Sequence, residues 1–105
     1  MNKMLQEAQR MQAELAKAQE EAATEIVEAS AGGGMVTVKA NGAGEVVEIA
    51  IDPRAIDPAD PELLADMVRA AVNEALRSSR SLMESKMSGL IPGDLGGLGG
   101  LLPGS

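Results

Sequence analysis

The sequence predicts an α+β fold in which a long helix, a three-stranded antiparallel sheet and a second long helix follow one another. Three observations lead to this order. Apolar residues recur every three or four positions over residues 2–23, alternate with other residues over 24–52, and return to the three-to-four spacing over 61–88. With 105 residues the chain is long enough for one domain, which we place at 1–88, followed by a tail at 89–105.

The first helix is predicted over residues 2–23, where no glycine or proline interrupts and strong helix formers dominate. Its apolar positions form a narrow stripe of small or flexible side chains: Met1, Met4, Ala8, Met11, Leu15, Ala18 and Ala22. Such a stripe suits close packing along a partner helix better than it suits a deep globular core.

Three strands are predicted next, over 24–31, 35–40 and 45–51. The glycines at 32–34 allow backbone angles that other residues resist, and Asn41 followed by Gly42 is a strong hairpin signal. Short turns make the sheet an antiparallel meander with one apolar face. That face needs a cover, and the helices are the only candidates.

The second helix is predicted over residues 61–88, with Asp60 as its N-cap, Pro61 in the first helical position and Gly89 at its end. A broad apolar face, wide enough to cover the sheet, is formed by Leu64, Met67, Val68, Ala71, Val72, Ala75, Leu82 and Met83. The segment 89–105 is too rich in glycine and proline to hold a regular element, and we expect a flexible tail there.

The chain contains no Phe, Trp or Tyr, so its core must come from aliphatic side chains and methionine. Aromatic residues normally contribute the largest apolar areas to a core. A chain this short therefore gains much from sharing its apolar surface with a second copy. We expect a homodimer on these grounds alone.

The absence of Cys and His removes disulfides, thiolate nucleophiles, the usual zinc ligands and the ordinary general base. We therefore expect no enzyme, no metal, no cofactor and no small-molecule substrate, and we interpret Ser78, Ser79, Ser81 and Ser85 as the solvated surface of a helix. The opening residues do not resemble a signal peptide, and no apolar run approaches the roughly 18 residues of a membrane span. A cytoplasmic protein with no membrane partner is expected.

The formal net charge of −7 argues against a nucleic-acid partner if it is taken as one number. Its distribution matters more. Residues 24–61 carry a net charge of −5, whereas residues 1–23 carry −1 and residues 62–88 carry none. The acidity lies in the middle of the chain, and the two helical segments are close to neutral.

A basic row on the first helix is the first candidate for a binding site. Lys3, Arg10 and Lys17 are seven residues apart, which places them within about 40° of one another over roughly 21 Å of helix. Such a row could lie along or across a DNA backbone. Glutamates lie three or four residues from each of these bases, so the same row is also interpretable as a salt-bridged solvated face.

The second candidate is a group of arginines on the second helix, Arg69, Arg77 and Arg80, with Lys86 further along. The three arginines share an arc of about 80° away from the apolar face. Their planar guanidinium groups suit phosphate contacts. Positive charge near a helix C-terminus is also favoured by the helix dipole, which offers a purely structural explanation.

The opening helix MLQEAQRMQAELAKAQEE, the hairpin GGGMVTVKANGAGEVVEIAIDP and the helix PELLADMVRAAVNEALRSSRSLMESKM together resemble the YbaB/EbfC family of bacterial nucleoid-associated proteins over residues 2–88. The resemblance implies an α-β-β-β-α chain that forms a tweezer-like homodimer with its long helices as paired arms. It also implies DNA binding with little sequence preference, localisation in the nucleoid, and a role in nucleoid organisation or gene regulation.

In that family basic residues on the projecting helices contact DNA. The positions here that match by type and placement are Lys3, Arg10, Lys17, Arg77, Arg80 and Lys86. The sequence departs from this pattern in its acidity, because a glutamate stands beside nearly every base. The alternative is a structural or interaction module whose paired helices grip a protein partner, and the acidic sheet region favours this alternative mildly.

Overall fold

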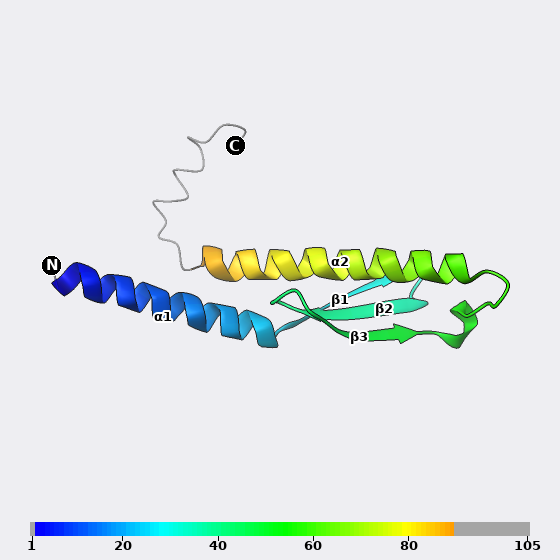
Figure 1. Cartoon of the computed structure of the whole chain (residues 1–105), viewed down its shortest axis with the longest axis horizontal. Coiled ribbons are helices and arrows are strands. Elements are labelled where there is room, and N and C mark those ends of the chain that lie inside the picture. The colour runs from blue at the N-terminus through cyan, green and yellow to red at the C-terminus, as the bar shows by residue number, and fades with distance from the viewer. Residues whose placement is uncertain (1, 90–105) are drawn as a thin grey trace, which may run out of the picture.

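The computed structural model describes residues 2–89, and its elements follow the predicted order (Figure 1). The elements are α1 (Asn2–Thr24), β1 (Ile26–Ala31), β2 (Val36–Asn41), β3 (Val46–Ile51), a short 3₁₀ turn η1 (Pro53–Ala55) and α2 (Pro61–Ser88). The α-β-β-β-α fold is therefore confirmed. α2 lies along the sheet, whereas α1 projects beyond it and contacts the rest of the molecule mainly at its C-terminal end (Figure 1).

The core lies between α2 and the first two strands of the sheet. The strands are antiparallel in the order β1-β2-β3, and Val36 and Val38 of β2 are fully buried, as their alternation predicted. They pack with Ala71 and Ala75 of α2, which are also fully buried. Small residues on the helix allow α2 to lie close to the sheet, so a thin core forms without aromatic side chains.

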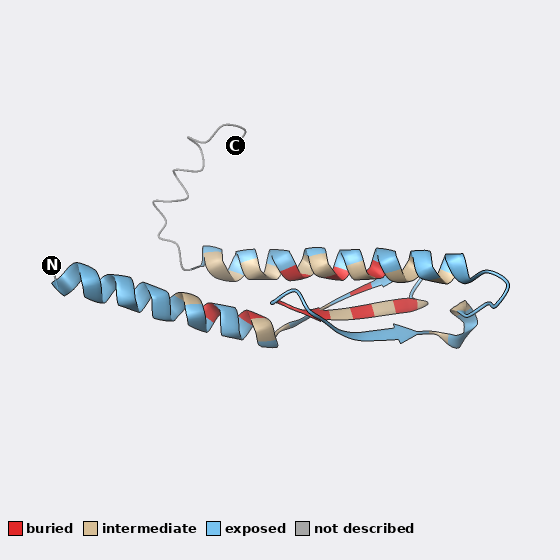
Figure 2. Ribbon diagram, in the orientation of Figure 1, coloured by how far each residue is buried: buried red, intermediate tan, exposed pale blue. Residues whose placement is uncertain are grey.

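β3 extends this apolar face past the edge of α2. Ile49 pairs with Val38 and Ile51 pairs with Val36, so both isoleucines lie on the face that α2 covers elsewhere. Nevertheless, Ile49 is 45% exposed and Ile51 37% exposed, and every residue of β3 is exposed (Figure 2). One chain therefore leaves part of its own sheet uncovered.

The two predicted turns are confirmed, with one difference in detail. Gly32, Gly33 and Gly34 all have positive φ angles, as the triple glycine predicted. In the second turn the positive φ falls on Gly44. Asn41 closes that loop, because its side-chain oxygen accepts hydrogen bonds from the backbone N–H groups of Ala43 (3.0 Å) and Glu45 (3.2 Å).

Gly42 has a different role from Gly44, because at this residue the backbone of the hairpin comes close to α1. Its backbone N–H donates to the carbonyl of Ala22 at 2.9 Å, in the last turn of α1. A Cβ at position 42 would collide with that same carbonyl oxygen, so only glycine fits. The same carbonyl also accepts from the backbone N–H of Glu25 at 3.1 Å, so the hairpin adds a second hydrogen bond at the C-terminal end of α1.

Ser79 joins α2 to the same place, and here the prediction of a solvated surface is wrong. Its side chain is 1% exposed, and its hydroxyl donates to the carbonyl of Asn41 at 2.6 Å. A serine on the buried stripe is satisfied because the end of β2 passes close to the helix. Hydrogen bonds from the hairpin and from α2 thus meet at residues 41 and 42, at the base of α1.

The predicted start of α2 is confirmed, because the Asp60 side chain accepts a hydrogen bond from the backbone N–H of Leu63 at 3.2 Å and Pro61 occupies the first turn. Gly89 is the C-cap. The tail predicted at 89–105 lies outside the described residues from position 90 onward. Neither of the two long helices within 2–89 is apolar enough over its length to cross a membrane.

Candidate nucleic-acid interface

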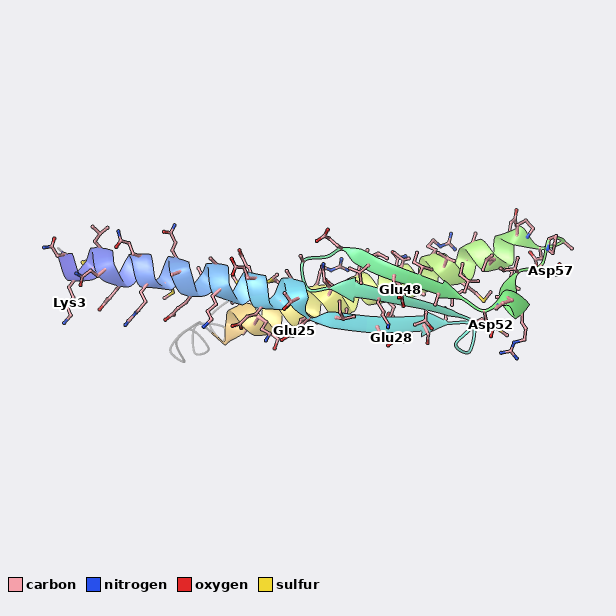
Figure 3. All side chains as sticks on the ribbon, turned by 90° about the horizontal axis from the view of Figure 1, so that it is seen from below. Lys3, Glu25, Glu28, Glu48, Asp52 and Asp57 are labelled. Carbon is pink, nitrogen blue, oxygen red and sulfur yellow. The ribbon has the colours of Figure 1, made fainter. Side chains whose placement is uncertain are left out.

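The basic row of α1 runs from the projecting end of the helix at Lys3 to Lys17, next to Ala18, where α1 packs against the rest of the molecule. Lys3, Arg10 and Lys17 are all exposed, and consecutive members are about 10.5 Å apart along the axis at 1.5 Å per residue. Lys3 lies near the far end of the arm, with its side chain directed away from the helix (Figure 3). α1 therefore presents three exposed cations in a line, with Lys3 at its projecting end.

None of these cations is paired with a carboxylate within residues 2–89. The ion pairs found in that part of the chain are Lys39–Glu48, Arg54–Asp52, Arg69–Asp66, Arg77–Glu74 and Lys86–Glu25, and none involves α1. A row of glutamates, Glu7, Glu14 and Glu21, lies on the side of the basic row that faces the apolar stripe. Gln6, Gln9 and Ala13 flank the other side. That other side is uncharged beside Lys3 and Arg10, whereas Glu20 lies on it beside Lys17.

The arginines of α2 lie on its outer face, opposite the buried Ala75 and Ser79. Arg77 donates to the Glu74 carboxylate at 2.6 Å, although its side chain remains 59% exposed. Arg80 is exposed and has no ion pair within the part of the chain that the structure describes. The structure thus brings Arg77 and Arg80 to one face but leaves only Arg80 without a carboxylate partner there.

Lys86 is separated from these arginines. Its ammonium lies 2.6 Å from the carboxylate of Glu25, and its side chain is only 30% exposed. Glu25 follows α1 directly, so this ion pair ties the last turn of α2 to the base of the α1 arm (Figure 3). The hydrogen bond to Glu25 is the main reason that the pKa of Lys86 is raised above its ordinary value.

The direction of this pKa change determines how the stabilising effect of the Lys86–Glu25 ion pair depends on pH. A raised pKa in the folded state means that the pair stabilises the fold fully below the unfolded-state pKa, and that this stabilisation is lost as pH rises through the raised value. We expect Glu25→Gln to lower the pKa of Lys86 towards the ordinary 10.5. An NMR titration of the lysine side chains over roughly pH 9 to 12 measures this shift.

Glu28→Gln is the matched control, because Glu28 lies only three residues further along, in β1, and makes no ion pair with Lys86. This variant should leave the titration of Lys86 as it is in the unaltered protein. If Glu25→Gln and Glu28→Gln gave the same Lys86 curve, the tie between α2 and the base of the arm would not exist in solution.

The charge is polarised along the molecule. Glu28, Glu48, Asp52 and Asp57 lie on or beside the sheet, at the end opposite to Lys3 (Figure 3). Of the two bases among residues 24–61, Lys39 is paired with Glu48. Arg54 is bound by Asp52 at 2.8 Å, and this contact lowers the pKa of the Asp52 carboxyl. The sheet region, with a net charge of −5 over residues 24–61, is therefore more acidic than the arm, which carries −1 over residues 1–23.

Nothing in residues 2–89 gathers three potential metal-ligating side chains. A shallow apolar groove of about 400 Å³ lies on α1, lined by Met4, Glu7, Ala8, Met11, Gln12 and Leu15. No local signal in the sequence pointed to the positioning contacts of Gly42, Ser79 and Glu25. Each of these depends on a partner distant in the chain.

Comparison with known proteins gives a concordant result. Residues 1–95 match the YbaB/EbfC DNA-binding family. A nucleoid-associated protein of Moorella thermoacetica is 53% identical over 88 residues, covering 84% of this chain and 85% of the relative. One of Saccharopolyspora erythraea is 48% identical and covers 99% and 92%. The crystal structure of an uncharacterized protein from Helicobacter pylori shares the fold, with a TM-score of 0.77 at 23% identity over 88% of this chain and 97% of that one.

Proposed function

This chain belongs to the YbaB/EbfC DNA-binding family, and we propose that it binds DNA as a homodimer through the basic row of α1. Its role is that of a DNA-binding protein of the nucleoid, which lies in the bacterial cytoplasm. The proposal assigns phosphate contacts first to Lys3, Arg10 and Lys17, and second to Arg77 and Arg80 on the outer face of α2. Lys86 is assigned a bracing role at the base of the arm, since its ammonium is bound by Glu25.

The observation that carries the proposal is the unpaired state of the α1 row within the described residues. A cation already bound to a carboxylate must give up that pair before it can hold a phosphate, and the α1 cations have no such pair to break. Phosphates recur about every 3.4 Å along one strand of duplex DNA. Each 10.5 Å interval on α1 therefore spans about three phosphates.

Contacts of this kind hold the DNA backbone without reading the bases. Lysine and arginine on phosphates supply affinity and register but no sequence information. The chain contains no aromatic side chain on which bases could stack. We therefore propose binding with little sequence preference and no catalysis, in a role that organises the nucleoid or affects gene expression.

The second copy is proposed to seat against the uncovered apolar face at β3. Ile49 and Ile51 are half-exposed on an edge strand, and Ile56 and Leu63 beside it are 56% and 55% exposed. An edge strand with an open apolar face is a ready site for pairing with another chain. A second copy would bury this face and double the number of arm cations from three to six.

Salt dependence tests the proposal directly. Neutralisation of six phosphates predicts a slope of about −5 for log affinity against log salt, so affinity should fall roughly a thousandfold between about 50 and 200 mM salt. Fluorescence anisotropy of labelled duplexes with the purified, nuclease-treated protein measures this fall. Two duplexes of unrelated sequence should give similar curves. An affinity that stayed constant over this range would contradict binding through the basic row.

A further inference from the structure

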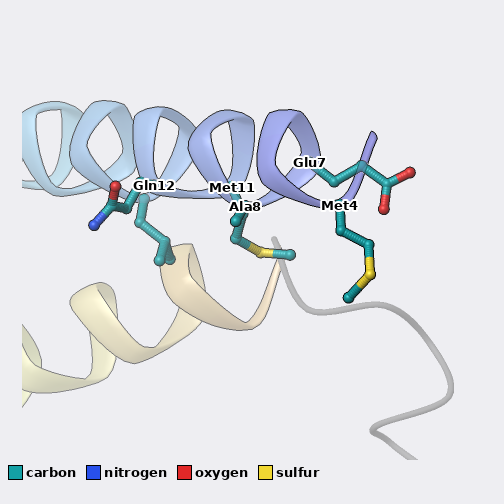
Figure 4. A pocket seen from close by; sticks show the side chains of 6 residues that line it. Met4, Glu7, Ala8, Met11 and Gln12 are labelled. Atoms are coloured by element: carbon teal, nitrogen blue, oxygen red, sulfur yellow. The ribbon is translucent and has the colours of Figure 1, made fainter. Parts of the chain in front are cut away.

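The apolar stripe of α1 is covered at one end and open at the other. Ala18 is 6% exposed and Ala22 is fully buried, whereas Met4 is 77% exposed and Met11 43% exposed. The open part is the apolar groove of about 400 Å³ already described on α1. Met4, Ala8 and Met11 line it on one side of the helix (Figure 4). The apolar stripe that is buried at Ala18 and Ala22 therefore continues along α1 as an exposed apolar surface.

The cover stops where α2 stops. α2 packs against the C-terminal part of α1 and ends at Ser88, with Gly89 as its C-cap. The last turn of α2 lies beside the groove, near Ala8 and Met11 (Figure 4). The residues that follow Gly89 in the chain therefore start at the boundary between the covered and the open parts of the stripe.

The sequence of that following segment matches the groove in chemistry and length. Residues 90–102 contain one charged residue, Asp94, and six large aliphatic ones: Leu90, Ile91, Leu95, Leu98, Leu101 and Leu102. The groove from Met4 to Leu15 is about 17 Å long at 1.5 Å per residue. Five or six extended residues span that distance, so the segment reaches the end of the groove with residues to spare.

We propose that residues 90–102 fold back along α1 and cover the apolar groove of their own chain. Docking through leucines needs no regular element, so it agrees with a composition rich in glycine. A second copy of α1 fits less well, because it would bring a further row of glutamates to the margin of the contact. The basic row lies on a different arc of α1 and stays open when the groove is covered, so this inference is independent of DNA binding.

Methionine methyl groups report on the groove in the full-length protein. We compare the unaltered chain with Leu95→Ser/Leu98→Ser/Leu101→Ser by NMR of methyl-labelled methionine. Met4 and Met11 should shift towards solvent-exposed values in the triple variant, whereas Met35 and Met67, at the far end of the sheet, should not move. Gly97→Ser/Gly100→Ser is the matched control, because it adds serines to the same segment and keeps every leucine. Unchanged Met4 and Met11 signals in the leucine variant would refute the docking.

Cross-linking identifies the occupant, and the chain offers a clean background because it has no cysteine. Met11→Cys/Leu98→Cys should form a disulfide within one chain about tenfold faster than Gln9→Cys/Leu98→Cys, whose cysteine lies on another face of α1. Met11→Cys alone should stay unlinked. Disulfide-linked dimers from this single variant would show that a second α1 occupies the groove, and equal rates for the two pairs would show that nothing is docked there.

Discussion

Replacing Lys3, Arg10 and Lys17 together by glutamine is expected to reduce DNA affinity about a hundredfold or more at roughly 0.1 M salt. The physical reason is counterion release. Every phosphate that is no longer neutralised by a cation lowers the slope of log affinity against log salt by about 0.9, so the slope of a dimer without its six arm cations should be smaller by about 5. Because glutamine is a good helix former, α1 should persist. Salt-titrated anisotropy measures the affinity, and circular dichroism verifies the helix content.

The matched control uses the glutamate row of the same helix. Glu7→Gln/Glu14→Gln/Glu21→Gln changes the same number of residues on α1 but removes negative charge near the DNA, so it should strengthen binding. Opposite effects from the two triple variants would assign the interaction to the electrostatics of α1. Equal affinities for the two variants would move the site elsewhere, with the outer face of α2 at Arg77 and Arg80 as the next candidate.

The fold followed from local patterns in the sequence, because each element carries its own signal. The helical spacing of residues 2–23 and 61–88 predicted both helices, which end within one residue of the observed bounds. Asp60 and Pro61 fixed the start of α2 through contacts only three residues apart. The strands also agree to within two residues, since alternation along a chain reports directly on the two faces of a sheet.

The candidate site was predictable only in part, because ion pairing depends on distant residues. Helical spacing predicted that Lys3, Arg10 and Lys17 share one face of α1, but it left open whether the glutamates neutralise them. Lys86 was grouped with the arginines because it is basic and near the helix end. Its angular position actually places it towards α1, where Glu25 binds it across 61 positions of sequence. Ser79 was misinterpreted for the same reason, since its acceptor is the carbonyl of Asn41 on β2.

The second large effect is expected from a change at the proposed homodimer interface. Ile49→Glu is expected to convert the proposed homodimer into a monomer of 10.8 kDa. Ile49 is already 45% exposed in a single chain, so a glutamate there can stay hydrated when the chain is alone. Within the proposed interface the same carboxylate would be buried without a partner, and an uncompensated buried charge costs several kcal/mol. Sedimentation equilibrium across a range of protein concentrations measures the change in mass.

Loss of the dimer should also weaken DNA binding, because a monomer has one α1 arm and a dimer has two. A monomer presents three α1 cations where the dimer presents six, so Ile49→Glu should halve the salt slope and reduce affinity on the order of a hundredfold at about 0.1 M salt. Ile26→Glu is the control, because Ile26 is 52% exposed on the opposite edge strand, β1, and should leave both mass and affinity unchanged. A dimeric Ile49→Glu protein would place the interface away from β3. If the Ile49→Glu variant were monomeric but bound DNA as tightly as the unaltered protein, a single arm would suffice. The second copy would then add nothing to DNA affinity.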